Sequence, residues 1–288
     1  MEFGPKVREI RQKKGFSQKE TYNGIISKSY SIDFEKGNHK ISTDLLIEIL
    51  DRLSMDIDEF FYINRGYLLN PYSDYIYRLS NYSNFHDAAA LKKMLTEYEA
   101  FDDIVNQVRC AEIRCRIRMI ENIKETGKFD PAVILKEDRQ TIQEYLINIE
   151  TWTLQEVQLF GNTIEFLEFS THFELFRNLS KSLTLYMEYD KGREIFCAML
   201  INLITQSIKH DYLDYAEVLN QQLRLLSTNY KEFFHKTISF YFEKVISFKR
   251  GSRSDYQEAE QILLTISKLG QPAIAKELNA LLNSNAIK

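Results

Sequence analysis

Six cations within the first 20 residues are the side chains of this sequence best placed to do chemistry. They stand against three glutamates, which gives the stretch a net charge of +3, whereas the whole 288-residue chain carries a formal net charge of −4. Clustered lysine and arginine side chains neutralise phosphate groups and release the counterions bound to nucleic acid. A single +3 face binds DNA weakly, so we expect two copies to bind a palindromic site together. The cations are Lys6, Arg8, Arg11, Lys13, Lys14 and Lys19.

Patterns typical of catalysis or metal binding are missing from the sequence. The five histidines are scattered without His-Glu-x-x-His spacing, and there is no glycine-rich phosphate loop and no Gly-x-Ser-x-Gly turn. Cys110 and Cys115 are five residues apart, which on a helix directs them about 140° apart and argues against a metal or redox pair. Together with Cys197 they are interpreted as packed thiols. We therefore expect no enzymatic activity, no metal and no cofactor.

The elements that would position the cations are five short helices predicted within residues 1–62. Gly15 ends a basic first helix at the position where helices favour glycine. Ser17 and Glu20 have the spacing of a capping box, which begins the second helix. Ser27 caps a third short helix that Gly37 closes, and this is the expected place for a recognition helix.

Two further helices complete this domain. Ser42 caps the first of them, and Asp56 with Glu59 forms a second capping box that begins the other. Between these caps, apolar residues recur at the spacing of one buried helix face. They are Leu45, Leu46, Ile49, Leu50 and Leu53.

This domain resembles the helix-turn-helix domain of phage repressors and their bacterial relatives. The family pattern runs Arg, Gly, Ser-Gln, then Ser-x-Ser followed by Glu-x-Gly. In that family the arginine of the first helix pairs with the glutamate after the recognition helix. The resemblance therefore implies that Arg11 and Glu35 are structural partners and not DNA contacts. The matching residues here are Arg11, Gly15, Ser17-Gln18, Ser27, Ser29, Glu35 and Gly37.

The same resemblance implies which side chains would meet DNA. Lys28 is expected to contact phosphate and Tyr30 to discriminate between bases. Two positions depart from the family pattern. Ser31 stands where an apolar core residue is usual, and Asp33 stands where a basic or neutral residue would face phosphates, which predicts weaker DNA binding. The candidate DNA contacts are Arg8, Lys14, Gln18, Lys28, Ser29, Tyr30, Lys36 and Lys40.

Length and composition predict a large helical core beyond this domain. The chain has 44% hydrophobic residues, four prolines and ten glycines. Gly66 and Pro71 both disfavour continued helix, so we expect a helix-turn-helix domain at 1–65, a linker at 66–71 and a second domain at 72–288. No signal peptide and no span of 18 uninterrupted apolar residues are found, so we expect a cytoplasmic protein without membrane contact.

The second domain is predicted to be a stack of helical hairpins. Segments 210–217 and 253–260 both place Asp-Tyr before a small alanine that lets a neighbouring helix approach. Tyr215 and Tyr256 are 41 residues apart, near the length of a hairpin repeat. Two amphipathic helices with chance similarity are the alternative, but polar breaks that leave helices of roughly 14 to 20 residues favour repeats. The fold class is therefore predicted to be all-α, with the helix-turn-helix domain followed by a tetratricopeptide-like right-handed repeat domain. The breaks lie at residues 124–131, 189–192, 209–211, 249–254 and 270–272.

A second resemblance covers the whole chain. Residues 151–162, Thr-Trp-Thr-Leu-Gln-Glu-Val-Gln-Leu-Phe-Gly-Asn, together with the helix-turn-helix and the total length, resemble the Rgg family of streptococcal and related Gram-positive transcriptional regulators. The resemblance implies a cytoplasmic quorum-sensing regulator. Such a protein is a homodimer that binds promoter DNA and holds a short, secreted and reimported signalling peptide on the concave face of its repeat domain.

Candidate peptide contacts lie on the expected concave wall, from about Ala132 to Leu226. They are Asn202, Arg193 and Tyr186, because grooves between stacked hairpins bind extended peptides and this region is rich in aromatic and amide side chains. Asn202 lies in an apolar run, where an amide either satisfies a neighbouring helix end or faces a groove, and both alternatives stay open.

Other polar and aromatic residues have simpler interpretations. Trp152, the only tryptophan, is expected to anchor the core. Arg114, Arg116 and Arg118 cannot share one helix face, so most are expected to be solvated, with one reaching a peptide carboxylate. An alternative function is a helical-repeat interaction module whose N-terminal domain no longer binds DNA, as Asp33 would permit.

Overall fold

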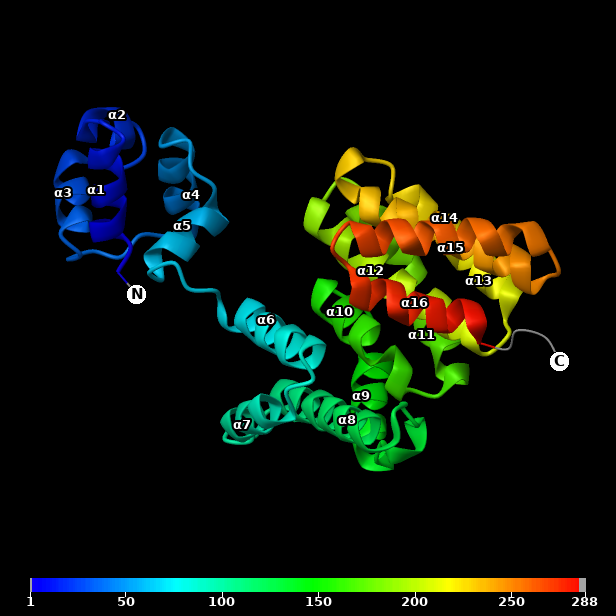
Figure 1. The fold of residues 1–288 in the computed structure, drawn as a ribbon. Coiled ribbons are helices and arrows are strands. Elements are labelled where there is room, and N and C mark those ends of the chain that lie inside the picture. Colours follow the sequence, from blue (N-terminus) through cyan, green and yellow to red (C-terminus); the bar gives the residue numbers. More distant parts are fainter. Residues whose placement is uncertain (1, 285–288) are drawn as a thin grey trace. The chain divides into compact units, whose positions relative to one another are not determined.

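The computed structural model describes residues 2–284 and, within them, the side chains of all residues except Ser180 and Lys181. Met1 and residues 285–288, the outer ends of the two predicted domains, lie outside the described residues. The described part consists of helices and contains no strand, which confirms the predicted all-α class. The chain forms two compact units, unit 1 (Met1–Phe85) and unit 2 (His86–Lys288) (Figure 1).

Unit 1 contains the five predicted short helices, and local capping explains where they begin. The hydroxyls of Ser17, Ser27 and Ser42 each accept an N–H from the first turn of the helix that follows. Ser17 also forms the complete capping box predicted with Glu20. Asp56 accepts two backbone N–H groups at the start of the fifth helix. The helices are α1 (Gly4–Lys13), α2 (Gln18–Tyr22), α3 (Lys28–Glu35), α4 (Thr43–Arg52) and α5 (Ile57–Asn64).

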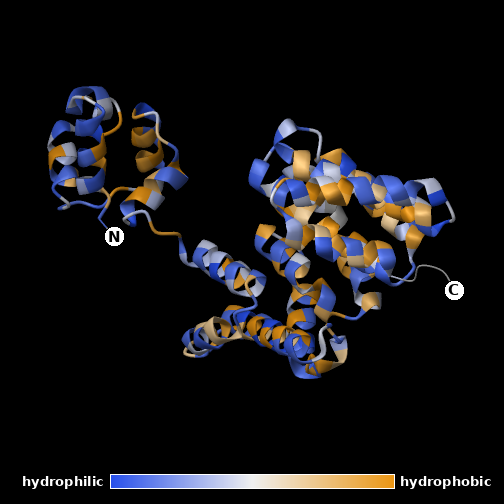
Figure 2. Ribbon diagram, in the orientation of Figure 1, coloured by the Kyte–Doolittle hydropathy of each residue, from blue (hydrophilic) through white to orange (hydrophobic). Residues whose placement is uncertain are grey.

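These helices enclose a core of their own. Figure 2 shows apolar residues on the inner sides of the helices of this unit. The start of α1 lies directly against the end of α3, since a Cβ added to Gly4 would stand 1.6 Å from the carbonyl oxygen of Phe34. The residues at the centre of this core are Val7, Tyr22, Phe34, Leu46, Ile49, Leu50, Leu53 and Phe60.

The predicted linker is a break between helices, but unit 1 continues beyond it. Gly66 has a φ of +72°, and Asn70 caps α6 (Pro71–Asn84), in which Pro71 is the first residue. Proline fits the first turn of a helix because a backbone N–H at that position would have no partner within the helix, so its absence costs no hydrogen bond. Gly66 and Pro71 therefore mark a turn between two helices, and the division between the units comes later, after Phe85.

Unit 2 is a stack of helices in which each helix of the C-terminal half packs on the next. Contacts join α12 to α13, α13 to α14, α14 to α15 and α15 to α16, and α12 also contacts α10, α14 and α16. Ala216 and Ala259, the small residues of the two similar segments, are both fully buried in α13 and α15. The helices are α7 (Ala88–Tyr98), α8 (Ile104–Thr126), α9 (Lys136–Asn148), α10 (Leu154–Thr163), α11 (Phe169–Leu183), α12 (Asp190–Lys209), α13 (Leu213–Leu226), α14 (Phe233–Lys249), α15 (Arg253–Lys268) and α16 (Pro272–Asn283), with 3-10 turns η1 (Pro131–Val133), η2 (Ile164–Phe166), η3 (Thr184–Tyr186) and η4 (Tyr230–Glu232).

Trp152 anchors the core as predicted. It is 4% exposed, donates its indole N–H to the carbonyl of Leu146 at 3.2 Å and meets Phe160 edge-on. The three cysteines are buried free thiols, also as predicted. Among residues 2–284, no helix combines the length and apolar character needed to cross a bilayer.

The prediction that most of Arg114, Arg116 and Arg118 are solvated is wrong. Arg114 and Arg118, one turn apart on α8, both form ion pairs with the buried carboxylate of Asp138. Arg116 points elsewhere and pairs with Glu165 at 2.5 Å. These carboxylates lie 20 to 49 residues away in the sequence, so periodicity along α8 could not show them.

Candidate nucleic-acid interface and ligand pocket

A buried cluster of hydrogen bonds fixes α3 against α1 and α2. The Arg11 guanidinium contacts Glu35 through two bonds, Nε to Oε1 at 2.6 Å and Nη2 to Oε2 at 3.0 Å. Gln18 and the Tyr22 hydroxyl also donate to this carboxylate, at 2.8 and 2.7 Å. Arg11 additionally donates to the carbonyl of Phe16. The predicted structural pair is therefore present, and it lies inside the domain.

The protonation states follow from these contacts. Burial acts to raise the pKa of Glu35, but the hydrogen bonds from Arg11, Gln18 and Tyr22 outweigh it, and the pKa is held below its usual value. The bond to Glu35 in turn raises the pKa of Arg11. The pair stays ionised at neutral pH, so α3 is held by a charge-assisted contact.

The two departures from the repressor pattern have different settings on α3. Ser31 is buried, and its hydroxyl donates to the carbonyl of Lys28 at 2.9 Å, so a polar residue sits in the core without an unsatisfied group. Asp33 is partly exposed, with its nearest ion-pairing partner at 4.0 Å in the ring of His39.

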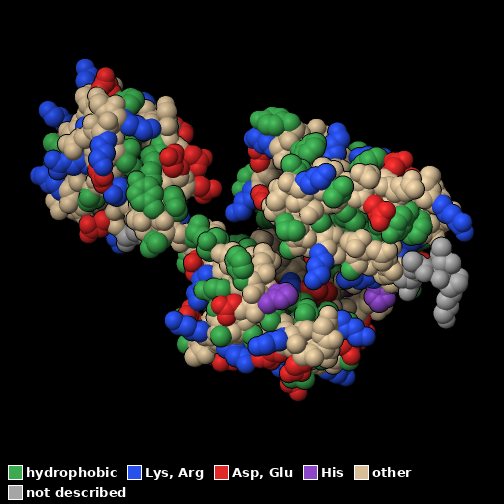
Figure 3. Space-filling view, viewed as in Figure 1, with side chains coloured by type: hydrophobic (Ala, Val, Ile, Leu, Met, Phe, Trp, Pro, Cys, Tyr) green, Lys and Arg blue, Asp and Glu red, His purple; other side chains and the backbone are tan. Residues whose placement is uncertain are grey.

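Six of the eight candidate DNA contacts are exposed on unit 1, among them Lys14 directly after α1. Lys28 and Ser29 begin α3, Lys36 follows its last residue, Lys40 lies in the next loop, and Arg8 is on α1. Figure 3 shows Lys and Arg side chains gathered over α1–α3, while Asp and Glu side chains gather near α4 and α5. The positive charge of this unit is thus concentrated on the side that carries α3.

Two candidates have partners within the protein. The Lys14 ammonium donates to the carbonyls of Leu53 and Ser54, at 2.7 and 3.1 Å, where the end of α4 leaves carbonyls without helical partners. Gln18 donates to Glu35. Both side chains hold the domain together, and their DNA contacts stay predictions.

Tyr30 also has internal partners. Its hydroxyl donates to the carbonyl of Lys40 at 2.6 Å, and its ring stacks on His39 with 5.1 Å between centroids. These contacts fold the loop after α3 back along the helix. Tyr30 therefore positions Lys40 in addition to any contact it makes with bases.

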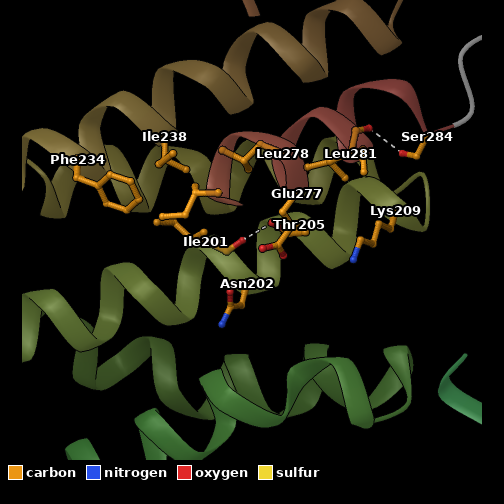
Figure 4. A pocket seen from close by; sticks show the side chains of 12 residues that line it. Ile201, Asn202, Thr205, Lys209, Phe234, Ile238, Glu277, Leu278, Leu281 and Ser284 are labelled. Atoms are coloured by element: carbon orange, nitrogen blue, oxygen red, sulfur yellow. Dashed lines mark hydrogen bonds between the residues drawn. The ribbon is translucent and has the colours of Figure 1, made fainter. Parts of the chain in front are cut away.

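Unit 2 contains a pocket between α12, α14 and α16, with a volume of about 300 Å³ (Figure 4). Its lining is mainly apolar, and Figure 4 shows Phe234 and Ile238 of α14 beside Ile201 of α12 and opposite the side chains of α16. Alternate helices thus line it, as expected of a repeat groove. The wall extends past the predicted limit of Leu226. The apolar residues that it receives from α16 are Ile274, Leu278, Ala280 and Leu281.

Polar groups in this pocket differ in what they can still bind. The Thr205 hydroxyl donates to the carbonyl of Ile201, one turn earlier in α12, at 2.8 Å, and the Ser284 hydroxyl donates to the carbonyl of Leu281 at the end of α16 at 2.7 Å. Asn202 is among the lining residues, but its amide donates to the carbonyl of Gly161 near the end of α10 at 3.0 Å, and Figure 4 shows its side chain pointing away from Phe234 and Ile238. Its contact with a peptide stays a prediction. Lys209 and Glu277 add an exposed charge of each sign.

Arg193 and Tyr186 are not among the residues of this pocket. Arg193 is buried and pairs with Glu232 at 3.0 Å, while also contacting Asp190 and the carbonyl of Met187. Tyr186 packs on Phe196. The structure gives both predicted peptide contacts internal partners. The pocket residues of α16 were missed, although their i, i+4, i+7 spacing at 274, 278 and 281 is that of an apolar face.

Within residues 2–284, no three His, Cys, Asp or Glu side chains are grouped so as to hold a metal ion. An exposed α3 held by a buried ion pair, followed in the chain by a stack of helices with an apolar pocket, is the architecture of the transcription regulators that combine a helix-turn-helix domain with a helical repeat domain.

Comparison with known proteins specifies the family. Residues 88–280 match the family described as HTH-type transcriptional regulator Rgg, C-terminal domain. The chain belongs to the Rgg family, as its sequence predicted.

Solved structures share the fold over the full length. A Listeria monocytogenes EGD-e protein described as a transcriptional regulator is 31% identical, with a TM-score of 0.89 over 100% of this chain and 99% of that one. The SHP pheromone receptor Rgg2 of Streptococcus dysgalactiae is 23% identical, with a TM-score of 0.78 over 99% and 100%. PrgX in complex with cCF10 is 18% identical, with a TM-score of 0.72 over 99% of both chains.

Proposed function

We propose that this protein is a cytoplasmic, homodimeric transcription regulator that binds promoter DNA through unit 1 and a short apolar signalling peptide through the pocket of unit 2. The observation that carries the proposal is the mainly apolar pocket between α12, α14 and α16, in a chain that also has a complete helix-turn-helix domain. Such pockets bind apolar side chains, while the few polar groups orient the ligand. The pheromone receptors among its structural relatives support a peptide as that ligand.

Peptide binding is tested by calorimetry with synthetic peptides encoded by short open reading frames beside the gene. Ala280 lines the pocket on α16, whereas Ala273 is exposed on the same helix and does not line it. Ala280→Trp should fill the pocket and weaken binding at least about tenfold, while Ala273→Trp should leave it unchanged. Equal affinities of the two variants would place the peptide elsewhere.

DNA binding is tested by mobility-shift assays of the full chain on fragments of its own genomic locus, at one stated salt concentration. Retardation of promoter fragments over coding fragments supports the proposal. Peptide binding without retardation of any fragment would instead favour the interaction-module alternative.

A further inference from the structure

The outer face of α3 has an acidic residue at its centre. Successive residues of a helix are rotated by 100°, and the buried side of α3 is marked by Ser31, Phe34 and Glu35. Ser29 and Asp33, one turn apart, point directly away from that side. A carboxylate thus occupies one of the two positions of α3 that point most directly away from the core of unit 1.

The flanks of the same face have different chemistry. Lys28 lies on one edge and is exposed. Tyr30 lies on the other, where its hydroxyl and ring hold the segment that carries His39 and Lys40. Cations at the edges of a recognition helix meet phosphates, while the residues between them meet base edges in the major groove.

The carboxylate of Asp33 is available for such a contact. Its side chain is 42% exposed, and the one ion-pairing partner recorded for it in the described part of the chain is the His39 ring at 4.0 Å, which is charged only when protonated. A carboxylate repels phosphate but accepts a hydrogen bond from the N4 amino group that cytosine presents in the major groove. An acceptor centred between flanking donors fits a base edge and not the backbone.

We propose that Asp33 reads bases and selects cytosine at one position of each half-site. The proposal rests on the DNA binding of the proposed function and adds the base that α3 selects. Asp33 then lowers affinity for most sequences and raises discrimination, since a wrong base leaves the carboxylate without a donor.

The test is selection of binding sites from a random duplex pool with the full-length protein and three variants. The wild type should enrich cytosine at one position per half-site. Asp33→Asn should change the preferred base at that position to adenine, because an asparagine amide matches the N6 and N7 groups of adenine. Asp33→Ala should show no base preference at that position. Affinity of Asp33→Ala for the wild-type site should fall roughly 5- to 150-fold. Asp51→Asn, the same charge change at an exposed position of α4, should alter no base preference.

Two outcomes would overturn the proposal in distinguishable ways. If Asp33→Asn binds every sequence more tightly and selects the same bases as the wild type, Asp33 only repels phosphate. If the wild type enriches no sequence, DNA recognition by unit 1 fails as well. Circular dichroism of each variant establishes that the exposed substitutions leave the fold intact.

Discussion

The carboxylate of Glu35 joins three helices of unit 1 at one point. It receives donors from Arg11 of α1, Gln18 and Tyr22 of α2, and belongs itself to the end of α3. Its exposure is 3%, and its bonds from Arg11 and Tyr22 are buried, while the bond from Gln18 is partly buried. The orientation of α3 therefore depends on this buried carboxylate and its donors.

We expect Glu35→Ala to destabilise unit 1 by roughly 3 kcal/mol, because the substitution leaves the Arg11 guanidinium buried without its partner. Glu9→Ala is the matched control. Glu9 pairs with Lys6 and Lys13 on the surface of α1, where solvent screens the charges, so losing those pairs should cost much less than losing Glu35. Urea unfolding of a fragment comprising residues 1–85 measures both. Similar losses for the two variants would mean that burial does not strengthen the Arg11–Glu35 pair.

Lowering the pH should reduce the free energy of unfolding of unit 1, because Glu35 becomes protonated. The pKa of Glu35 in the folded protein lies below its usual value of 4.5, so the charged form favours folding at neutral pH. That contribution is complete above the usual value and is lost as the pH falls through the lower folded value. Unfolding free energies from pH 7 to pH 3 should therefore fall more steeply for the wild type than for Glu35→Gln. Parallel curves would show that other carboxylates dominate the acid response.

At the scale of elements, the crossing of α10 and α12 positions one wall of the pocket. A Cβ on Gly161 would lie 3.1 Å from the Cβ of Met199 and 3.2 Å from its Cα, so the two helices touch at this point. Asn202, one turn further along α12, donates to the carbonyl of the same glycine. A glycine there permits both the close approach and the hydrogen bond.

Gly161→Val should destabilise unit 2 by about 1–3 kcal/mol, because α12 must move away from α10 to make room for the new side chain. Gln155→Val is a control at an exposed position of the same helix and should cost under about 1 kcal/mol. Trp152, the only tryptophan, lies just before α10 and reports unfolding by its fluorescence. Should Gly161→Val prove as stable as the control, the crossing is wider than described.

The sequence could predict where helices begin when the residues that set the boundary, such as caps, lie close together in the chain. The caps at Ser17, Ser27 and Ser42 lie within three residues of the N–H groups that they accept, so the helices of unit 1 were predictable. Ion pairs between distant segments carry no such signal. The sequence predicts Arg193 as a ligand contact, because nothing in it identifies Glu232, 39 residues away, as the partner of Arg193.

Asn202 shows the same limit for the candidate site. Its place in an apolar run indicated a special role, but only the packing of α10 on α12 shows that its amide donates to a carbonyl near a helix end. The wall contributed by α16 depends on contacts between α12 and α16, which periodicity within either helix does not specify.

For the whole molecule, we expect the full chain to bind operator DNA much more tightly than residues 1–85 alone. Two copies contact twice as many phosphates, so the slope of log affinity against log salt concentration should be about twice as steep for the full chain. Fluorescence anisotropy on a palindromic site and on a half-site measures both quantities. Equal affinities of fragment and full chain at the same salt concentration would contradict a dimeric complex.

The buried cysteines make this protein well suited to site-specific labelling. Burial raises the pKa of Cys115 and Cys197 to about 12 and also raises that of Cys110, so little thiolate is present at neutral pH. Thiolate is the species that reacts with maleimide dyes. A cysteine introduced at an exposed position would therefore react ahead of the natural three. One dye on each unit would then allow energy transfer to report, in solution, whether a peptide changes the distance between the units.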